Sequence, residues 1–220
     1  QAVVATDATD ITDTGKQNYL RNFSVGKTGV YNAMKNKTIA ALKEMDFLKK
    51  FTGILIHDHE TALYHFGTDH GECNVHIIRY LRKTKEDTGN KWPEKMIDLL
   101  CEMNKATKEL INQGITTFPK EIIADYEQNY HNLIVDGRKE NKETPHKYAK
   151  QEELTLLNRL DKYSHNHLLF LHNFDVFFDD NISERDLRKA KNRQKMAGGF
   201  RKDSGHEMYC SILTIIETIK

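Results

Sequence analysis

Three carboxylates in this chain of 220 residues have the types and positions to act together: Asp7, Asp58 and Glu184. The first follows a small, β-branched segment, the second follows an apolar run at 53–57, and the third begins a basic helical pattern. Carboxylates that converge repel one another, and Mg²⁺ or Mn²⁺ removes this repulsion because both ions prefer oxygen ligands. Two such ions, about 3.5–4 Å apart, activate a water or a 3′-hydroxyl and stabilise the oxygen that leaves a phosphodiester. The three residues therefore predict a site for phosphodiester chemistry with two Mg²⁺ (or Mn²⁺) ions.

The segment 184–202 is strongly basic, with eight Lys and Arg residues against two acidic ones. A local excess of this kind fits a polyanionic partner such as DNA, although a solvated helix face would have the same composition. The spacing places some of these residues on one helical face and others on a neighbouring stripe. The candidate DNA-binding residues are Arg185, Arg188, Lys189, Lys191, Lys195 and Arg201.

Each of the three carboxylates also has a structural interpretation. Asp7 could be a residue at the end of a strand, and Asp58 could cap the helix that follows it. Glu184 could belong to a capping box with Asn181 as the N-cap, or it could pair with Arg188 one turn further on. Spacing alone leaves these interpretations and the shared site evenly balanced.

The elements that must position these residues follow from apolar patterns and turn residues. A strand that ends near Asp7, two further strands and the turns between them predict an antiparallel meander. A buried central strand then delivers Asp58 at its carboxyl end, where open α/β sheets usually hold ligands. The strands are predicted at 2–7, 19–25, 29–34 and 53–57, with turns at 13–16 and at Gly26-Lys27-Thr28. The fold class is therefore α/β.

Most of the remaining chain has helical periodicity. Helices are predicted at 38–50, 61–66, 74–86, 96–111, 122–136, 154–171 and 204–220, with a brief strand at 72–73, a polar loop at 139–145 and a helix break at Gly198-Gly199. The middle of the chain is thus a mostly helical block between two α/β segments.

Cysteine usage and hydropathy bound the class of protein. Three cysteines, an odd number, are typical of the reduced thiols of a cytosolic protein. No apolar run approaches the roughly 20 residues of a membrane span, so we expect no membrane contact. The chain starts without Met on a strand pattern and stops within a helical pattern, and we expect a fragment of a longer protein.

Other residues with chemical potential have simpler interpretations. Cys73 and His76 are spaced like half a zinc site, but no second pair completes it, so packing or support of the site is favoured. His57 and His59 flank Asp58 and could be ligands, although a strand-end and a helix-start role are favoured. Trp92 could stack on a flipped base, but packing is the preferred role.

Three blocks of sequence carry a family resemblance. They are Val4-Ala5-Thr6-Asp7-Ala8-Thr9; Gly53-Ile54-Leu55-Ile56-His57-Asp58 with His70-Gly71-Glu72-Cys73-Asn74-Val75-His76; and Asn181-Ile182-Ser183-Glu184-Arg185-Asp186-Leu187-Arg188 with Gln194-Lys195-Met196-Ala197-Gly198-Gly199-Phe200-Arg201. Together they resemble the catalytic domain of the insertion-sequence-sixty-six family of transposases, which belongs to the bacterial DDE transposases. One departure is Ala8, where the family commonly has Glu directly after its first Asp.

The resemblance implies a ribonuclease H-like core, a mixed sheet flanked by helices, with a helical insertion between the second Asp and the Glu. The expected division is 1–89 for the first part of the core, 90–172 for the insertion and 173–220 for the last part. Asp7, Asp58 and Glu184 would be the DDE triad that binds two Mg²⁺. The implied activity is metal-dependent strand cleavage and strand transfer at transposon ends, with transposon-end and target DNA as partners.

The resemblance also implies a homo-oligomer on DNA and a bacterial cytoplasmic location, at the nucleoid when bound. Two alternatives stay open from the sequence. One is an inactive transposase remnant that acts only as a DNA-binding module, and the other is a ribonuclease H-like nuclease with different substrates.

Overall fold

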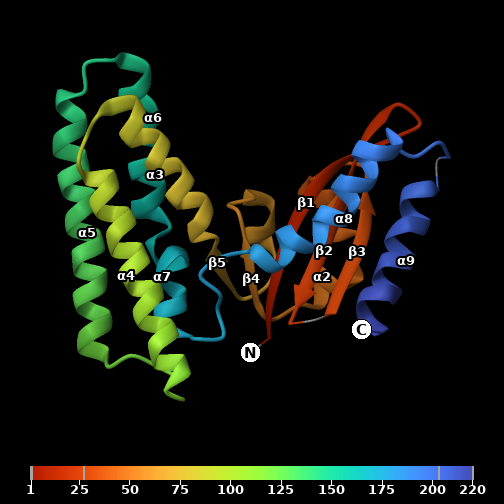
Figure 1. The fold of residues 1–220 in the computed structure, drawn as a ribbon, viewed down its shortest axis with the longest axis horizontal. Coiled ribbons are helices and arrows are strands. Elements are labelled where there is room, and N and C mark those ends of the chain that lie inside the picture. Colours follow the sequence, from red (N-terminus) through yellow and green to blue (C-terminus); the bar gives the residue numbers. More distant parts are fainter. Residues whose placement is uncertain (1, 27, 203, 220) are drawn as a thin grey trace. The chain divides into compact units, whose positions relative to one another are not determined.

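The computed structural model describes residues 2–26, 28–202 and 204–219, and its class is mixed α/β, as predicted. The chain divides into two compact units, whose helices and strands can be followed in Figure 1. The first unit combines Gln1–His70 with Asp180–Lys220, and the second is Gly71–Asp179. Both ends of the chain therefore contribute to the unit that contains all three candidate carboxylates.

A five-stranded mixed sheet has the order β3-β2-β1-β4-β5. Its strands are β1 (Val3–Asp13), β2 (Lys16–Val25), β3 (Thr28–Met34), β4 (Ile54–His57) and β5 (Asp69–Glu72). The first three strands form the predicted antiparallel meander, and β1 pairs with β4 in parallel. The predicted turn at Gly26-Lys27-Thr28 contains Lys27, which lies outside the described residues.

The prediction that β1 ends near Asp7 is wrong, because the strand continues to Asp13. The polar residues beyond Asp7 still alternate with buried ones, and Ile11 is among the most deeply buried side chains. The hairpin to β2 then turns through Thr14 and Gly15, both with positive φ (47° and 80°), as a two-residue loop requires. Asp7 therefore lies in the middle of a long strand.

Helices cover both faces of the sheet within this unit. On one face, α8 (Asn181–Ala197) contacts β1 and β2, and α9 (Gly205–Ile219) contacts β3 (Figure 1). Their apolar cluster consists of Ile11, Leu20, Tyr31, Leu187, Ala190, Phe200, Cys210 and Leu213. On the other face, α1 (Ile39–Lys43), α2 (Asp46–Lys50) and the 3₁₀ helix η1 (Thr61–His65) enclose a second cluster. It consists of Val4, Phe23, Met34, Leu42, Leu48, Leu55, Leu63 and Phe66. Alternation along β1 and β2 supplies both clusters.

Two helix boundaries in this unit bear on the predictions. The single helix predicted at 38–50 is wrong, because Met45 has an extended backbone (ψ 106°) and separates α1 from α2. The predicted break after α8 is confirmed, since Gly198 ends the helix in the left-handed conformation (φ 70°) that favours glycine. The predicted end of the last helix, Lys220, lies outside the described residues.

The second unit is helical. It contains α3 (Asn74–Thr88), α4 (Trp92–Asn112), α5 (Lys120–Glu143), α6 (Lys147–Lys162) and α7 (Ser164–His172). Within this unit α3 packs against α4 and α6. Trp92 is fully buried and donates from Nε1 to Glu153 Oε1 at 2.6 Å, which confirms a packing role for this residue.

Two predictions within the helical unit are wrong. The polar segment at 139–145 is predicted as a loop, but α5 continues through it as far as Glu143. Asn141 is buried in the last turn of this helix and donates to Glu153 Oε2 at 2.8 Å. The helix predicted at 154–171 is two helices that meet at Tyr163, where ψ is 23°.

Candidate active site

Asp7 and Asp58 come from neighbouring parallel strands. The ladder between β1 and β4 pairs Ala5 with Ile56, and two positions further along each segment lie Asp7, within β1, and Asp58, directly after β4. The pKa of Asp7 is raised, first because the side chain is buried and then because of the negative charge of Asp58. The structure therefore brings these two predicted carboxylates close enough for the charge of Asp58 to act on Asp7.

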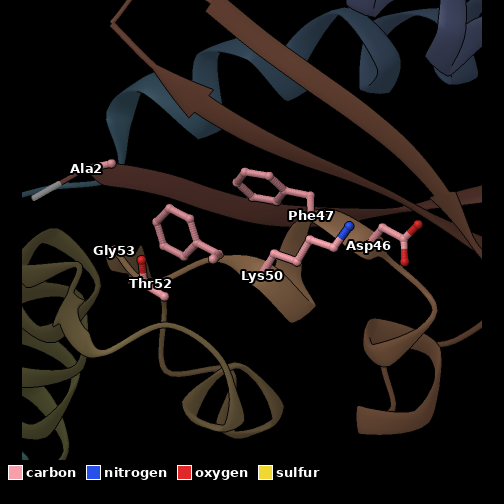
Figure 2. Close-up of a pocket in the computed structure, with 7 residues that line it drawn as sticks. Ala2, Asp46, Phe47, Lys50, Thr52 and Gly53 are labelled. Atoms are coloured by element: carbon pink, nitrogen blue, oxygen red, sulfur yellow. The ribbon is translucent and has the colours of Figure 1, made fainter.

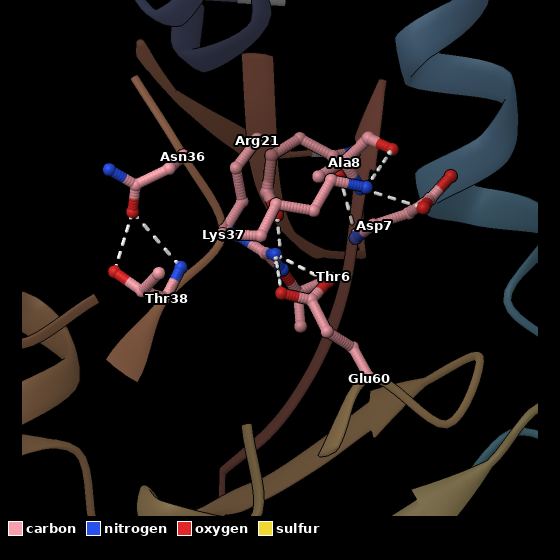
Figure 3. A network of polar contacts seen from close by, with 9 residues as sticks. Thr6, Asp7, Ala8, Arg21, Asn36, Lys37, Thr38 and Glu60 are labelled. Atoms are coloured by element: carbon pink, nitrogen blue, oxygen red, sulfur yellow. Dashed lines mark hydrogen bonds and ion pairs between the residues drawn. The ribbon is translucent and has the colours of Figure 1, made fainter. Parts of the chain in front are cut away.

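The surroundings of the Asp7 carboxylate include both a donor and two cations. Its Oδ1 accepts the backbone N–H of Ala8 at 2.6 Å, and this hydrogen bond and the charges of Lys191 and Lys37 lower its pKa. Lys37 lies near Asp7, because its Nζ donates to the carbonyl of the next residue, Ala8, at 3.4 Å (Figure 3). Lys191 was a predicted DNA-binding residue, whereas Lys37 lies outside the basic segment 184–202 and was not among the predicted residues.

A fourth carboxylate, Asp180, lies immediately before α8 and is almost fully buried. Burial raises its pKa well above the ordinary range, and the charge of Asp7, then those of Asp58 and Glu184, raise it further. A hydrogen bond with Ser183 acts in the opposite direction. All three predicted carboxylates therefore act electrostatically on one buried side chain.

Asp180 was missed by sequence reasoning, although its spacing from Glu184 was visible. The two acids are four residues apart, so they lie on one face of the first turn of α8. Like charges at this spacing destabilise a helix. An acidic pair of this kind beside two further carboxylates was the signal that could have identified Asp180.

The helix-cap interpretations of two carboxylates are wrong. α8 begins at Asn181 with Asp180 in the N-cap position, so Glu184 is its fourth residue and not part of a capping box with Asn181. The 3₁₀ helix η1 has Glu60 in its N-cap position, so Asp58 does not cap it.

The loop that follows Asp58 is held from the opposite face of the sheet. Arg21 of β2 is fully buried, and its Nη2 donates to Glu60 Oε1 and Oε2 at 2.5 and 2.6 Å. Its Nη1 donates to Thr6 Oγ1 at 3.1 Å (Figure 3). Within this loop His59 has φ 72°, a strained conformation for a residue with a side chain. An ion pair therefore stabilises a strained connection directly after Asp58.

His57 precedes Asp58 at the end of β4. It is fully buried, its Nε2 lies 3.2 Å from His70 Nδ1, and its ring contacts the ring of Tyr64 at 4.9 Å between centroids. Because side chains alternate along a strand, His57 faces the side of the sheet opposite to Asp58. These contacts agree with the predicted strand-end role for His57.

All six predicted DNA-binding residues have exposed side chains. Lys189 forms an ion pair with Glu217 of α9, and Arg185 Nε lies 3.7 Å from Asp186 Oδ1. The guanidinium of Arg193, in the same segment, lies over the ring of Phe200, with Cζ 3.9 Å from the ring centroid. Arg193 is therefore engaged in a cation–π contact within the protein. Some basic side chains of this segment thus already interact with acidic or aromatic side chains of the protein, a difference among them that the composition does not reveal.

The side chains near Asp180 are oxygen donors, which is the chemistry that Mg²⁺ and Mn²⁺ require. Among residues 2–26, 28–202 and 204–219, however, no group of three or more His, Cys, Asp or Glu side chains is arranged to hold a metal ion. The oxygen atoms near Asp180 are therefore suitable ligand types for Mg²⁺ or Mn²⁺, but the described side chains do not form a complete coordination site for a metal ion. All three cysteines are free thiols.

A hollow on the surface of the first unit lies elsewhere. Figure 2 shows that Phe47, Lys50 and Thr52 are among the residues that line it, together with Gly53. Gly53 precedes β4, whereas Asp58 follows the other end of that strand. This hollow is therefore separate from the carboxylates.

Comparison with known proteins gives one match. A family described as "Transposase IS66 family" matches residues 1–208 of the 220 in this chain. No curated protein and no solved structure matches. None of the helices in the described part of the chain has both the length and the apolar character needed to span a bilayer.

Proposed function

The chain belongs to the IS66 family of transposases, and on that premise we propose that it is a DDE transposase catalytic domain. In this proposal it hydrolyses a DNA strand at the transposon end. The freed 3′-hydroxyl then attacks a phosphodiester of target DNA, which joins the transposon strand to the target and releases a 3′-hydroxyl of the target strand. Asp7, Asp58 and Glu184 are the catalytic residues and the metal ligands.

The observation that carries this proposal is the family match over residues 1–208, and the strand register that brings Asp7 and Asp58 to neighbouring positions supports it. Residues from the middle of β1, the end of β4 and the first turn of α8 all raise the pKa of the buried Asp180 carboxyl. A concentration of negative charge in a buried place is costly unless protons or cations compensate it. Two divalent ions bound by oxygen ligands would supply that compensation.

The fold proposed for this domain is a ribonuclease H-like core with a helical insertion. The mixed sheet with helices on both faces supports the core. The helical unit Gly71–Asp179 supports the insertion, because it stands in the sequence between Asp58 and Glu184.

When bound, two Mg²⁺ or Mn²⁺ ions would activate a water or a 3′-hydroxyl and stabilise the leaving oxygen. Asp7, Asp58 and Glu184 hold them in this proposal, and Asp180 adds negative charge beside them. Lys37 and Lys191, whose charges act on Asp7, would neutralise a phosphate that approaches the site in this proposal. Arg21 holds the loop after Asp58 through Glu60.

DNA is the proposed partner, and the exposed basic residues of the α8 region are proposed to contact its backbone, apart from Lys189, whose ammonium group pairs with Glu217. Such contacts position DNA without reading its sequence. We further propose that the protein acts as a homo-oligomer on paired transposon ends in the bacterial cytoplasm.

The proposal is tested with Asp58→Asn and Glu184→Gln. Both variants are expected to lose Mg²⁺-dependent nicking of transposon-end DNA by at least 100-fold, while their DNA affinity stays within about two-fold, because phosphate contacts supply most of that affinity. Calorimetry with Mn²⁺ and DNA should show weaker metal binding in both variants. Asp46→Asn is the matched control, since Asp46 is an exposed carboxylate on α2 that pairs with Lys49.

Unchanged nicking in either variant would contradict the assignment of the triad. A wild-type protein that binds DNA but no Mn²⁺ would instead support an inactive remnant. Preference for an RNA–DNA hybrid over transposon-end DNA would point to a nuclease with other substrates.

A further inference from the structure

Asn22 of β2 lies directly opposite Asp7 in the antiparallel ladder and is fully buried. Its Oδ1 accepts from the backbone N–H of Asp7 at 3.2 Å and from Ser183 Oγ at 3.0 Å. Its Nδ2 donates to the Ser183 carbonyl at 3.1 Å and to Ser24 Oγ at 3.1 Å. A side-chain amide has two donor and two acceptor positions, so this one is fully used.

The same contacts continue along α8. Ser24 lies two residues after Asn22 on the same face of β2, and its Oγ donates to Asp186 Oδ2 at 2.7 Å. Ser183 and Asp186 stand on either side of Glu184 in the sequence, within one helical turn. We call Asn22, Ser24, Ser183 and Asp186 the polar clamp.

We propose that Asn22 is a positioning residue that sets the first turn of α8, and with it Glu184, against Asp7. The inference rests on the proposed function, because it is the assignment of Asp7 and Glu184 as metal ligands that makes their relative position matter. Asn22 itself touches neither substrate nor metal in this proposal. It acts through the Asp7 backbone and through Ser183.

Directional contacts explain why a polar residue is used at this place. One turn further along α8, Leu187 packs in an apolar cluster with Leu20, which lies two residues before Asn22 on the same face of β2. Apolar packing is non-directional, so it holds a helix on a sheet without setting its rotation closely. A buried amide leaves costly unpaired groups when the helix turns or slides. The polar clamp therefore restricts the first turn of α8 more closely than the apolar cluster does.

The inference is tested with Asn22→Leu, which keeps the volume but removes every hydrogen bond of the side chain. Ser183→Ala removes one donor to Asn22 and leaves the other three contacts of Asn22, and it also removes the hydrogen bond between Ser183 and Asp180. Asn141→Leu is the control. Asn141 is also buried, and its Nδ2 donates to Lys150 O and Glu153 Oε2 at 2.9 and 2.8 Å, but it belongs to the helical unit.

Two readouts are needed, and the first does not depend on activity. Amide hydrogen exchange in residues 181–187 is expected to be at least ten-fold faster in Asn22→Leu, and less affected in Ser183→Ala. In Asn141→Leu, exchange there should equal that of the wild type. The second readout is Mn²⁺ affinity by calorimetry, for which loss of a residue that orients ligands typically costs about 10–100-fold. Affinity for DNA should stay within two-fold of the wild type.

Exchange at 181–187 that stays at the wild-type rate in Asn22→Leu would overturn the inference. So would faster exchange with unchanged Mn²⁺ affinity, since the contact would then be structural only. Failure of the proposed function is distinguishable, because it is seen in the wild-type protein as absent Mn²⁺ binding. Failure of this inference is seen only in the comparison of the variants with the wild type.

Discussion

The backbone N–H of Glu184 donates a hydrogen bond of 3.1 Å to the carbonyl of Asp180, so the two acids stand one turn apart at the beginning of α8. The positive end of the helix dipole favours acids at this position, but their mutual repulsion opposes it. Asp7 and Asp58 add to that repulsion at Asp180. Without a bound cation, the simplest compensation is a proton on Asp180.

A proton on Asp180 makes the stability of the metal-free protein depend on pH. The unfolded Asp ionises at about pH 3.9, whereas the folded carboxyl holds its proton to a higher pH. The folded state then binds more protons, so the unfolding free energy falls as the pH rises above about 4, by up to about 1.4 kcal/mol per pH unit for one proton. Asp180→Asn should remove this loss. Urea unfolding at pH 4.5 and 7.5 in EDTA measures this. The unfolding free energy of Asp180→Asn should increase relative to that of the wild type as the pH rises.

Asp136→Asn is the control for this experiment. Asp136 is exposed, and its hydrogen bond with Lys139 lowers its pKa. Its contribution to the unfolding free energy is therefore present at neutral pH and is lost as the pH falls. The sign is opposite to that of Asp180. A difference between wild type and Asp180→Asn that does not change with pH would contradict the assignment of a proton to Asp180.

The ion pair between Arg21 and Glu60 should be essential for stability. Arg21→Met keeps most of the volume but leaves the mostly buried Glu60 carboxylate without its cation. Removing one partner of a buried pair typically costs about 3–5 kcal/mol. The double variant Arg21→Met/Glu60→Gln should recover part of this loss, because no charge is then left unpaired. Urea unfolding measures the unfolding free energy of both variants. Surface substitutions usually change it by no more than about 0.5 kcal/mol, so a value for Arg21→Met within that range of the wild type would contradict the prediction.

Gly137 should be required for packing of the helical unit. An added Cβ would lie 2.7 Å from Leu157 Cδ2 and 2.8 Å from Trp92 Cδ2, and the Trp92 ring is fixed by its hydrogen bond to Glu153. Gly137→Ala is therefore expected to destabilise this unit by about 1–3 kcal/mol, although alanine favours a helix. Thermal unfolding measures the change. Val135→Ala is the control, because Val135 is exposed on the same helix and its truncation creates no overlap.

The strands that carry Asp7 and Asp58 could be predicted because their patterns are local. A continuous apolar run identifies β4, and its carboxyl end is where an α/β sheet holds ligands. The length of β1 was missed because its second half is rich in Thr and Asp, which locally resemble a turn. The proximity of Asp7 to Asp58 depends on the pairing of β1 with β4, which lies about 50 positions away and leaves no local pattern.

Asp180 and Asn22 were missed for related reasons. Aspartate before a helix is ordinarily a cap, so apart from its spacing to Glu184 the sequence does not distinguish a buried, electrostatically coupled carboxyl at Asp180 from a solvent-exposed one. Asparagine is unfavourable in strands, and its role here depends on Ser183, which is 161 residues away. Contacts of this range are set by packing of α8 on the sheet, which periodicity within α8 does not reveal.

The basic residues of α8 should differ in their effect on DNA binding. Lys191 has an exposed side chain, and its charge acts on Asp7, so it lies on the side of α8 that faces the site. Lys191→Ala should weaken DNA binding and lower the slope of log K against log salt by about 0.9, the value for one phosphate contact on duplex DNA. Fluorescence anisotropy at several salt concentrations measures this slope.

Lys189→Ala is the informative comparison. The ammonium group of Lys189 already pairs with the mostly buried Glu217 carboxylate, so it is engaged within the protein. Its removal should leave the salt slope nearly unchanged and lower the unfolding free energy, because Glu217 loses its cation. Equal reductions of the slope in both variants would mean that DNA displaces Glu217, and that the whole exposed face of α8 lies against the phosphate backbone.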